Sequence, residues 1–155
     1  MTDIISTDSP LSAAQQDTLA IVVDMMIPAQ GDMPTAADPL ILKAIVEGLD
    51  DNNALVVQAL STLDDISNEK YGQWFAQLQS KHRGELIESF KSSHAELVQI
   101  IEFCTASKYY QDDRVMQALG LEARPPHPGG YRVDATDWSL LEPVRGREKI
   151  YRDIE

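Results

Sequence analysis

The chain has 155 residues, of which 43% are hydrophobic and 25% charged, and its formal net charge is -12. This length and composition predict a single globular domain and exclude a wholly disordered chain. Residues 1–69 contain twelve Asp or Glu and one basic residue, Lys43, whereas residues 70–155 contain thirteen acids and twelve Lys or Arg. Because such an acidic surface repels phosphates and anionic lipid headgroups, we expect no nucleic-acid partner. A basic surface on a protein partner would complement the acidic surface of this chain.

Cysteine content and the N-terminal residues limit the chemistry and the location of the chain. Cys104 is the only cysteine, which excludes an intrachain disulfide and a thiolate metal cluster built from this chain alone. The first eight residues carry acids, Asp3 and Asp8, where a secretory peptide needs basic residues, and no apolar run reaches the roughly 18–20 residues of a membrane span. We therefore expect no membrane insertion and a cytoplasmic location, with export to the periplasm together with a partner as the alternative.

Residues 11–120 are predicted to form helices. Ser12 and Gln15 have the spacing of a capping box, and apolar residues recur at helical spacing from Leu19 until Pro28 ends the helix near Ile27. A loop with several prolines follows, and Asp38-Pro39 begins the second helix as an N-cap with proline at the first helical position.

The remaining helices are expected in chain order. The third is capped by Asn53, buries Leu55, Ala59, Leu60, Leu63 and Ile66, and ends at Tyr71-Gly72. A short helical piece anchored by Trp74, Phe75 and Leu78 is expected next, followed by an apolar stripe at Leu86, Ile87 and Phe90. We then expect a longer helix from about Ser93 to Tyr109. The last helix is short, runs from Asp112 to Leu119 and is closed by Gly120. The predicted fold is an all-α orthogonal bundle with a flexible N-terminus at residues 1–10.

Residues 121–155 are predicted to form an extended and mostly irregular tail. The segment from Pro125 to Tyr131 contains three prolines and two glycines, so it cannot build a core of its own. The tail nevertheless keeps several aromatic and apolar residues, which disordered tails seldom carry. We expect it to wrap the bundle, a partner subunit, or both.

The residues that could carry chemistry do not form a recognisable site in the sequence. His82, His94 and His127 lack the spacing that puts two metal ligands on one helix face, so we expect no metal site. Cys104 lies on an apolar helical stripe, which favours a buried and inert thiol over a nucleophile. No glycine-rich phosphate loop and no strand-helix alternation is present, so we expect no nucleotide or flavin site and no catalytic residue in this chain.

Three groups of residues together resemble the gluconate 2-dehydrogenase subunit 3 family. Each group combines apolar helix positions with a turn or loop signal, and the middle group is the most specific. They are Leu11-Ser12, Leu19, Asp24, Ile27-Pro28, Pro34 and Ala36-Ala37; then Thr105, Tyr109-Tyr110, Asp112-Asp113, Val115 and Leu119-Gly120-Leu121; then Pro126 and Pro128 to Tyr131.

The resemblance implies a non-catalytic small subunit of a bacterial, heteromeric oxidoreductase. Its partner would be a large flavoprotein of the glucose-methanol-choline type that carries FAD and oxidises an alcohol or a sugar, with a cytochrome as a further candidate subunit. The small subunit would stabilise or mature the large one. A transient chaperone or adaptor for that flavoprotein, and a stand-alone helical enzyme, are the alternatives.

Four aromatic residues are the predicted partner anchors. Tyr110 lies in the bundle before its last predicted helix, and Tyr131, Trp138 and Tyr151 lie in the tail. Tyr and Trp are enriched at subunit interfaces because they bury a large apolar area and keep one polar group. The alternative for each ring is packing onto its own bundle.

Overall fold

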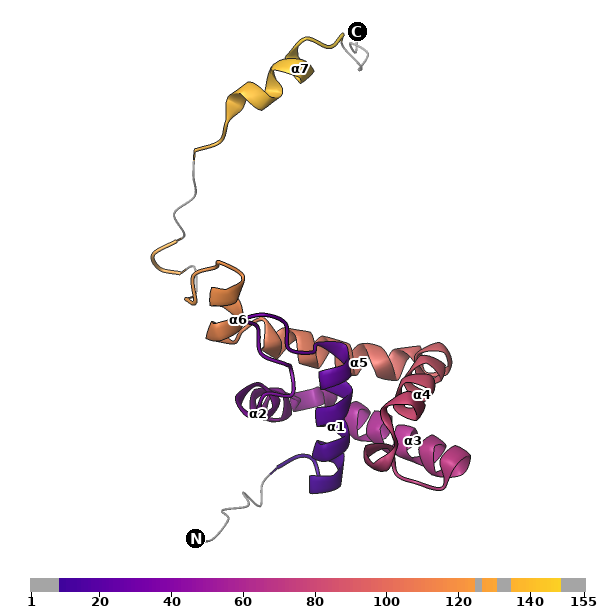
Figure 1. The fold of residues 1–155 in the computed structure, drawn as a ribbon. Coiled ribbons are helices and arrows are strands. Elements are labelled where there is room, and N and C mark those ends of the chain that lie inside the picture. The colour runs from indigo at the N-terminus through magenta and orange to yellow at the C-terminus, as the bar shows by residue number, and fades with distance from the viewer. Residues whose placement is uncertain (1–8, 125–126, 131–134, 149–155) are drawn as a thin grey trace. The chain divides into compact units, whose positions relative to one another are not determined.

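The computed structural model describes residues 9–124, 127–130 and 135–148, and the chain divides into two compact units, Met1–Ala123 and Arg124–Glu155. The described residues form seven α-helices and no strand apart from an isolated bridge between Gln30 and Met33, which confirms the all-α prediction. The first unit holds α1 (Ala13–Met26), α2 (Pro39–Glu47), α3 (Asn53–Tyr71), α4 (Ser80–Ser93), α5 (Ala95–Tyr109) and α6 (Asp113–Ala118). Figure 1 shows α1 running across the direction of α3 and α5.

The first two helices begin where the capping signals predict. The Ser12 side chain accepts a hydrogen bond from the Gln15 backbone N–H at 3.3 Å, and the Ser12 N–H donates to Gln15 Oε1 at 2.9 Å, which completes a capping box. Asp38 caps α2 by accepting from the Leu40 N–H at 3.0 Å, with Pro39 as the first helical residue. Local polar groups therefore define both helix starts.

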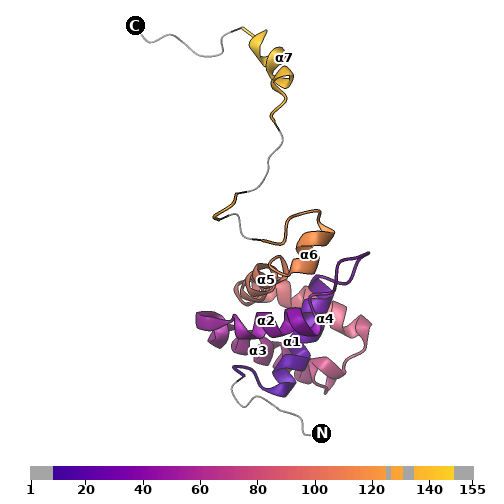
Figure 2. The ribbon, with the colours of Figure 1, turned by 90° about the vertical axis from the view of Figure 1, so that its left-hand side faces the viewer.

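The core of the bundle lies around α5. This helix packs against α2, α3 and α4, while α1 packs against α3, and the turned view in Figure 2 shows the same grouping. The largest side chains with less than 2% of their surface exposed are Tyr109, Phe75, Leu19, Ile41, Ile45, Leu49, Leu60, Leu63, Leu86, Val23, Val56 and Val115. Burial of these apolar side chains is the main force that holds the bundle together.

Two predictions for the third helix are wrong. Asn53 is its first helical residue, and Asn52 stands at the N-cap without a side-chain hydrogen bond, because a short 3-10 turn at Asp50–Asn52 already leads the chain into the helix. Leu55 is 40% exposed and Val56 takes the buried position, so the apolar stripe begins one residue later than expected. The predicted end at Tyr71-Gly72 is confirmed, with Gly72 in the left-handed conformation at φ 67°.

The segment after α3 also differs from the prediction in part. Phe75 and Leu78 are buried around a 3-10 turn at Phe75–Gln77, but Trp74 is 54% exposed and does not anchor it. Helix α5 begins at Ala95, because α4 continues to Ser93 and His94 lies between the two helices with a non-helical backbone.

The end of α6 explains the Leu119-Gly120-Leu121 sequence. The Gly120 N–H donates to the Gln117 carbonyl and the Leu121 N–H donates to the Met116 carbonyl, both at 2.9 Å. This pair of bonds is the Schellman motif, and it needs the positive φ of 74° that Gly120 adopts. The predicted helix end at Gly120 is therefore confirmed.

The second unit contains more regular structure than the sequence predicts. A 3-10 turn, Trp138–Leu141, leads directly into α7 (Glu142–Arg145). Asp137 caps this segment by accepting from the Ser139 N–H at 3.0 Å and from the Ser139 hydroxyl at 2.7 Å, which holds the pKa of Asp137 below its ordinary value. The sequence analysis, which expects a mostly irregular tail, does not predict this short helical segment.

Candidate partner interface

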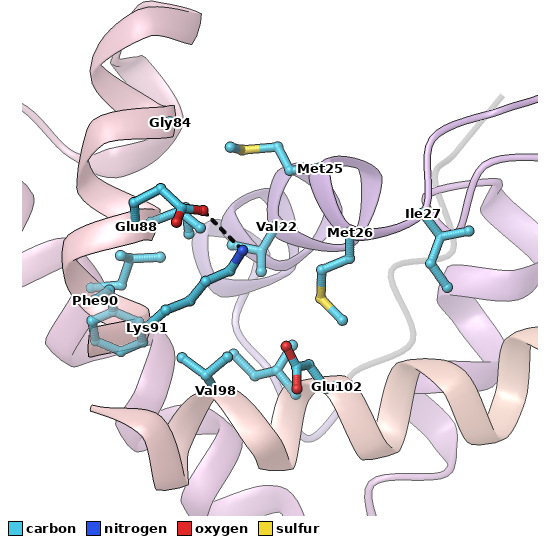
Figure 3. Close-up of a pocket in the computed structure, with 13 residues that line it drawn as sticks. Val22, Met25, Met26, Ile27, Gly84, Glu88, Phe90, Lys91, Val98 and Glu102 are labelled. Atoms are coloured by element: carbon cyan, nitrogen blue, oxygen red, sulfur yellow. Dashed lines mark hydrogen bonds and ion pairs between the residues drawn. The ribbon is translucent and has the colours of Figure 1, made fainter. Parts of the chain in front are cut away.

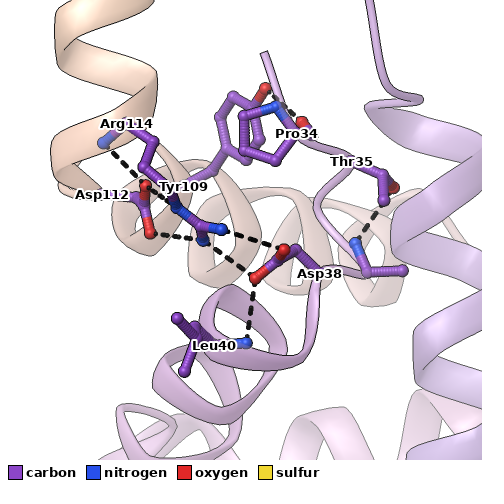
Figure 4. A network of polar contacts seen from close by, with 8 residues as sticks. Pro34, Thr35, Asp38, Leu40, Tyr109, Asp112 and Arg114 are labelled. Carbon is purple, nitrogen blue, oxygen red and sulfur yellow. Dashed lines mark hydrogen bonds and ion pairs between the residues drawn. The ribbon is translucent and has the colours of Figure 1, made fainter. Parts of the chain in front are cut away.

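Loop 28–38 is joined to the α5–α6 corner by a network of polar contacts (Figure 4). The Tyr109 hydroxyl donates to the Pro34 carbonyl at 2.8 Å, and only 1% of the Tyr109 surface is exposed. Burial raises the pKa of Tyr109, with smaller contributions from Tyr110 and Asp112, so this phenol stays protonated and serves as a donor.

Arg114 connects two helix caps that are far apart in the sequence. Its guanidinium donates to both carboxylate oxygens of Asp38, at 3.0 and 2.8 Å, and to both of Asp112, at 3.0 and 2.9 Å. Asp112 also caps α6 by accepting from the Arg114 N–H at 2.9 Å. The Arg114 hydrogen bonds hold the pKa values of Asp38 and Asp112 below their ordinary range and raise the pKa of Arg114 further.

Loop 28–38 is also held against α1. The Ala36 N–H donates to the Ile27 carbonyl at 3.0 Å, and Ala36 is fully buried. The Thr35 hydroxyl donates to Asp24 of α1 and accepts from the Ala37 N–H at 3.1 Å. Residues that carried the sequence resemblance, from Asp24 through Pro34 to Asp112, therefore have structural roles in this network.

Cys104, His82 and His94 are engaged in packing, whereas His127 is exposed. Burial raises the pKa of Cys104, which confirms the predicted buried thiol. His82 stacks on Tyr71 with ring centroids 4.6 Å apart, and His94 stacks on Phe90 at 4.9 Å. No group of three or more His, Cys, Asp or Glu within these residues could hold a metal ion.

The described residues contain no Rossmann-type dinucleotide-binding motif, in which a strand, a glycine-rich turn and a helix N-terminus hold the pyrophosphate. The described ranges contain helices, loops and one isolated bridge, and no such strand-to-helix turn lies among them. The helices in these ranges are also too short or too polar to cross a membrane.

Two of the four predicted anchor residues lie in the described part of the chain, and each is exposed within its own unit. Tyr110 is 53% exposed, and its ring meets the buried Tyr109 edge to face at 5.3 Å. Trp138 is 65% exposed in the second unit, where Leu140, Leu141 and Val144 are also exposed. Tyr131 and Tyr151 lie outside the described residues.

The bundle has a further apolar surface that the sequence analysis missed. A hollow of about 440 Å³ lies between α1, α4 and α5, with Leu63 of α3 also lining it (Figure 3). Val22, Phe90 and Ile101 line it, and Met25 is 40% exposed there. The only sequence signal for it is Gly84, a glycine inside a helix.

The fold and these surfaces define a small all-helical protein in which a polar network joins loop 28–38 to the α5–α6 corner and several apolar surfaces remain exposed. Residues 13–124, most of the chain, match the family model described as gluconate 2-dehydrogenase subunit 3, and the chain belongs to this family. This match confirms the resemblance seen in the sequence. Family membership implies that the chain is a subunit of a gluconate 2-dehydrogenase-type complex. No curated protein and no solved structure matches the chain.

Proposed function

We propose that this chain is a non-catalytic subunit that binds and stabilises the flavin-bearing large subunit of a dehydrogenase complex acting on an alcohol or a sugar. The main support is the family match over residues 13–124. In the proposal FAD and substrate bind to the large subunit, a flavoprotein of the glucose-methanol-choline type. The chain then contributes apolar contact surface and no reacting group.

The exposed aromatic residues are consistent with a lasting subunit interface. Tyr110 and Trp138 expose more than half of their surface, at 53% and 65%, and both residue types are common energetic centres of interfaces. We therefore retain both as proposed partner contacts. Tyr131 and Tyr151 stay predictions of the sequence.

Co-expression with the flavoprotein large subunit tests this proposal. We expect the large subunit to become soluble and flavin-loaded only when this chain is present, and the two to stay in fixed stoichiometry. A chaperone would raise the yield of flavin-loaded large subunit but would dissociate from it during purification. Substrate oxidation by the chain alone would contradict the proposal.

Replacing Trp138 by Ala tests the tail contact within this complex. Because Trp138 is exposed in its own unit, Trp138→Ala should change the free energy of unfolding of the chain by less than about 0.5 kcal/mol. It should weaken the complex by about 2 kcal/mol or more if the ring is an interface centre. Trp74→Ala is the matched control, since Trp74 is 54% exposed on the bundle and is not a proposed contact. Equal affinity of the two variants would exclude the tail contact.

A further inference from the structure

The hollow between α1, α4 and α5 is lined by residues of these three helices and by Leu63 of α3, and it reaches the buried core. Met25 extends toward α4 and Met26 toward α5, and Val98 lies on the opposite wall (Figure 3). Its volume of about 440 Å³ is larger than one side chain can fill. An occupant must therefore present several apolar groups together.

Gly84 of α4 lines this hollow and is not required by the fold of the bundle. Its φ is not positive, so the backbone does not need glycine there. A Cβ placed on Gly84 would meet nothing within 4 Å, so no neighbouring residue of the described chain needs the space. Glycine weakens a helix, and its use here is explained if an outside group approaches the backbone of α4 closely.

The charges at the rim favour a cationic neighbour. Glu88, Lys91 and Glu102 line the hollow, and Lys91 forms an ion pair with Glu88 at 3.0 Å. Two carboxylates and one ammonium group leave the rim with a net negative charge, in keeping with the net charge of -12 of the whole chain. A Lys or Arg beside the apolar groups of the occupant would complement Glu102.

We propose that this hollow receives an amphipathic helix of the dehydrogenase large subunit. Such a helix presents apolar side chains at positions i, i+3 or i+4 and i+7, which fill a groove together, and its backbone approaches closely at a glycine. Methionine side chains adapt to the shape of a bound helix, which suits Met25 and Met26 on the wall. A Lys or Arg of the bound helix pairs with Glu102. This inference rests on the proposed function and adds the contact surface and the chemistry of the partner segment.

The test fills the space beside Gly84 and measures how fast the chain leaves the co-expressed, immobilised large subunit. Gly84→Met places a large side chain in the hollow and should increase the dissociation rate about tenfold or more. Gly84→Ala adds a methyl group where the bound helix approaches the backbone and should increase the rate by a smaller factor, about threefold. Ala and Met are better helix formers than Gly, so neither variant should unfold at a lower temperature than the wild type.

A charge reversal provides a second, independent variant. Glu102→Lys should weaken the complex and reduce its dependence on salt, whereas Glu69→Lys, on α3 and outside the hollow, should do neither. Unchanged dissociation of both Gly84→Met and Glu102→Lys would overturn the proposal.

Three further outcomes separate this inference from the proposed function. If the wild-type chain binds the large subunit and Trp138→Ala weakens that binding while Gly84→Met and Glu102→Lys do not, the groove proposal fails and the proposed function stands. If native mass spectrometry finds a small apolar molecule bound to the wild-type chain and absent from Gly84→Met, the occupant is that molecule and the helix proposal fails. If the wild-type chain does not bind the large subunit, both fail.

Discussion

The corner formed by loop 28–38, α5 and α6 has its central polar groups paired, whereas the hollow between α1, α4 and α5 has apolar walls that no residue of the bundle fills. At the corner, Tyr109 and Arg114 each find partners more than seventy residues away in the sequence. At the hollow, Gly84 leaves open space and Met25 stays partly exposed. The contrast indicates that the corner stabilises the fold and that the hollow is available to a partner.

Adjacent tyrosines at the corner give the largest expected effect. Tyr109 is buried, so Tyr109→Ala should lower the free energy of unfolding by about 3–5 kcal/mol, and Tyr109→Phe, which removes only the bond to Pro34, by about 1 kcal/mol. Tyr110 is exposed, so Tyr110→Ala should cost less than about 0.5 kcal/mol. Denaturant unfolding measures all three. Similar decreases in the free energy of unfolding for Tyr109→Ala and Tyr110→Ala would contradict the distinction between a buried, stabilising ring and an exposed one.

Acidification should weaken the corner. Because Arg114 lowers the folded-state pKa values of Asp38 and Asp112, these carboxylates stabilise the fold above their unfolded pKa of about 4. That stability is lost as the pH falls through the folded pKa values. The melting temperature of Arg114→Gln should therefore lie below that of the wild type at neutral pH, and the difference should shrink below about pH 4. A difference that is constant across pH would mean that the ion pairs contribute nothing to stability.

Thr105 gives the smallest expected effect, and it has the opposite sign. Its side chain is fully buried in α5, and its hydroxyl has no hydrogen-bond partner among the described residues. Thr105→Val should therefore raise the free energy of unfolding, by about 1 kcal/mol. In the control Thr62→Val, a hydroxyl that donates to the Gln58 carbonyl is lost from an exposed position, and the change should be near zero. A loss of stability at Thr105 would show that its hydroxyl is paired.

The sequence predicts those parts of the fold that depend on neighbouring residues. The capping box at Ser12, the Asp38-Pro39 helix start and the glycines at the ends of α3 and α6 are local signals, and all are confirmed. The predicted burial of Leu55 and Trp74 is wrong. Both are apolar residues next to buried positions, and the sequence around them does not show whether they face the core or the solvent.

The surfaces depend on contacts that the sequence does not reveal. Asp38 was recognised as a cap, and Asp112 as the start of a helix, but the guanidinium that joins them comes from Arg114, 76 residues beyond Asp38. The hollow likewise forms from residues of four helices. Gly84 alone gave a local hint, and its meaning depends on the open space beside it.

Light scattering during size-exclusion chromatography of the co-expressed chain and flavoprotein large subunit tests the central claim most directly. We expect both polypeptides in one peak of constant stoichiometry that also carries the flavin absorbance. Elution of this chain as a separate monomer, with the flavin-loaded large subunit stable in another peak, would contradict its role as an integral subunit.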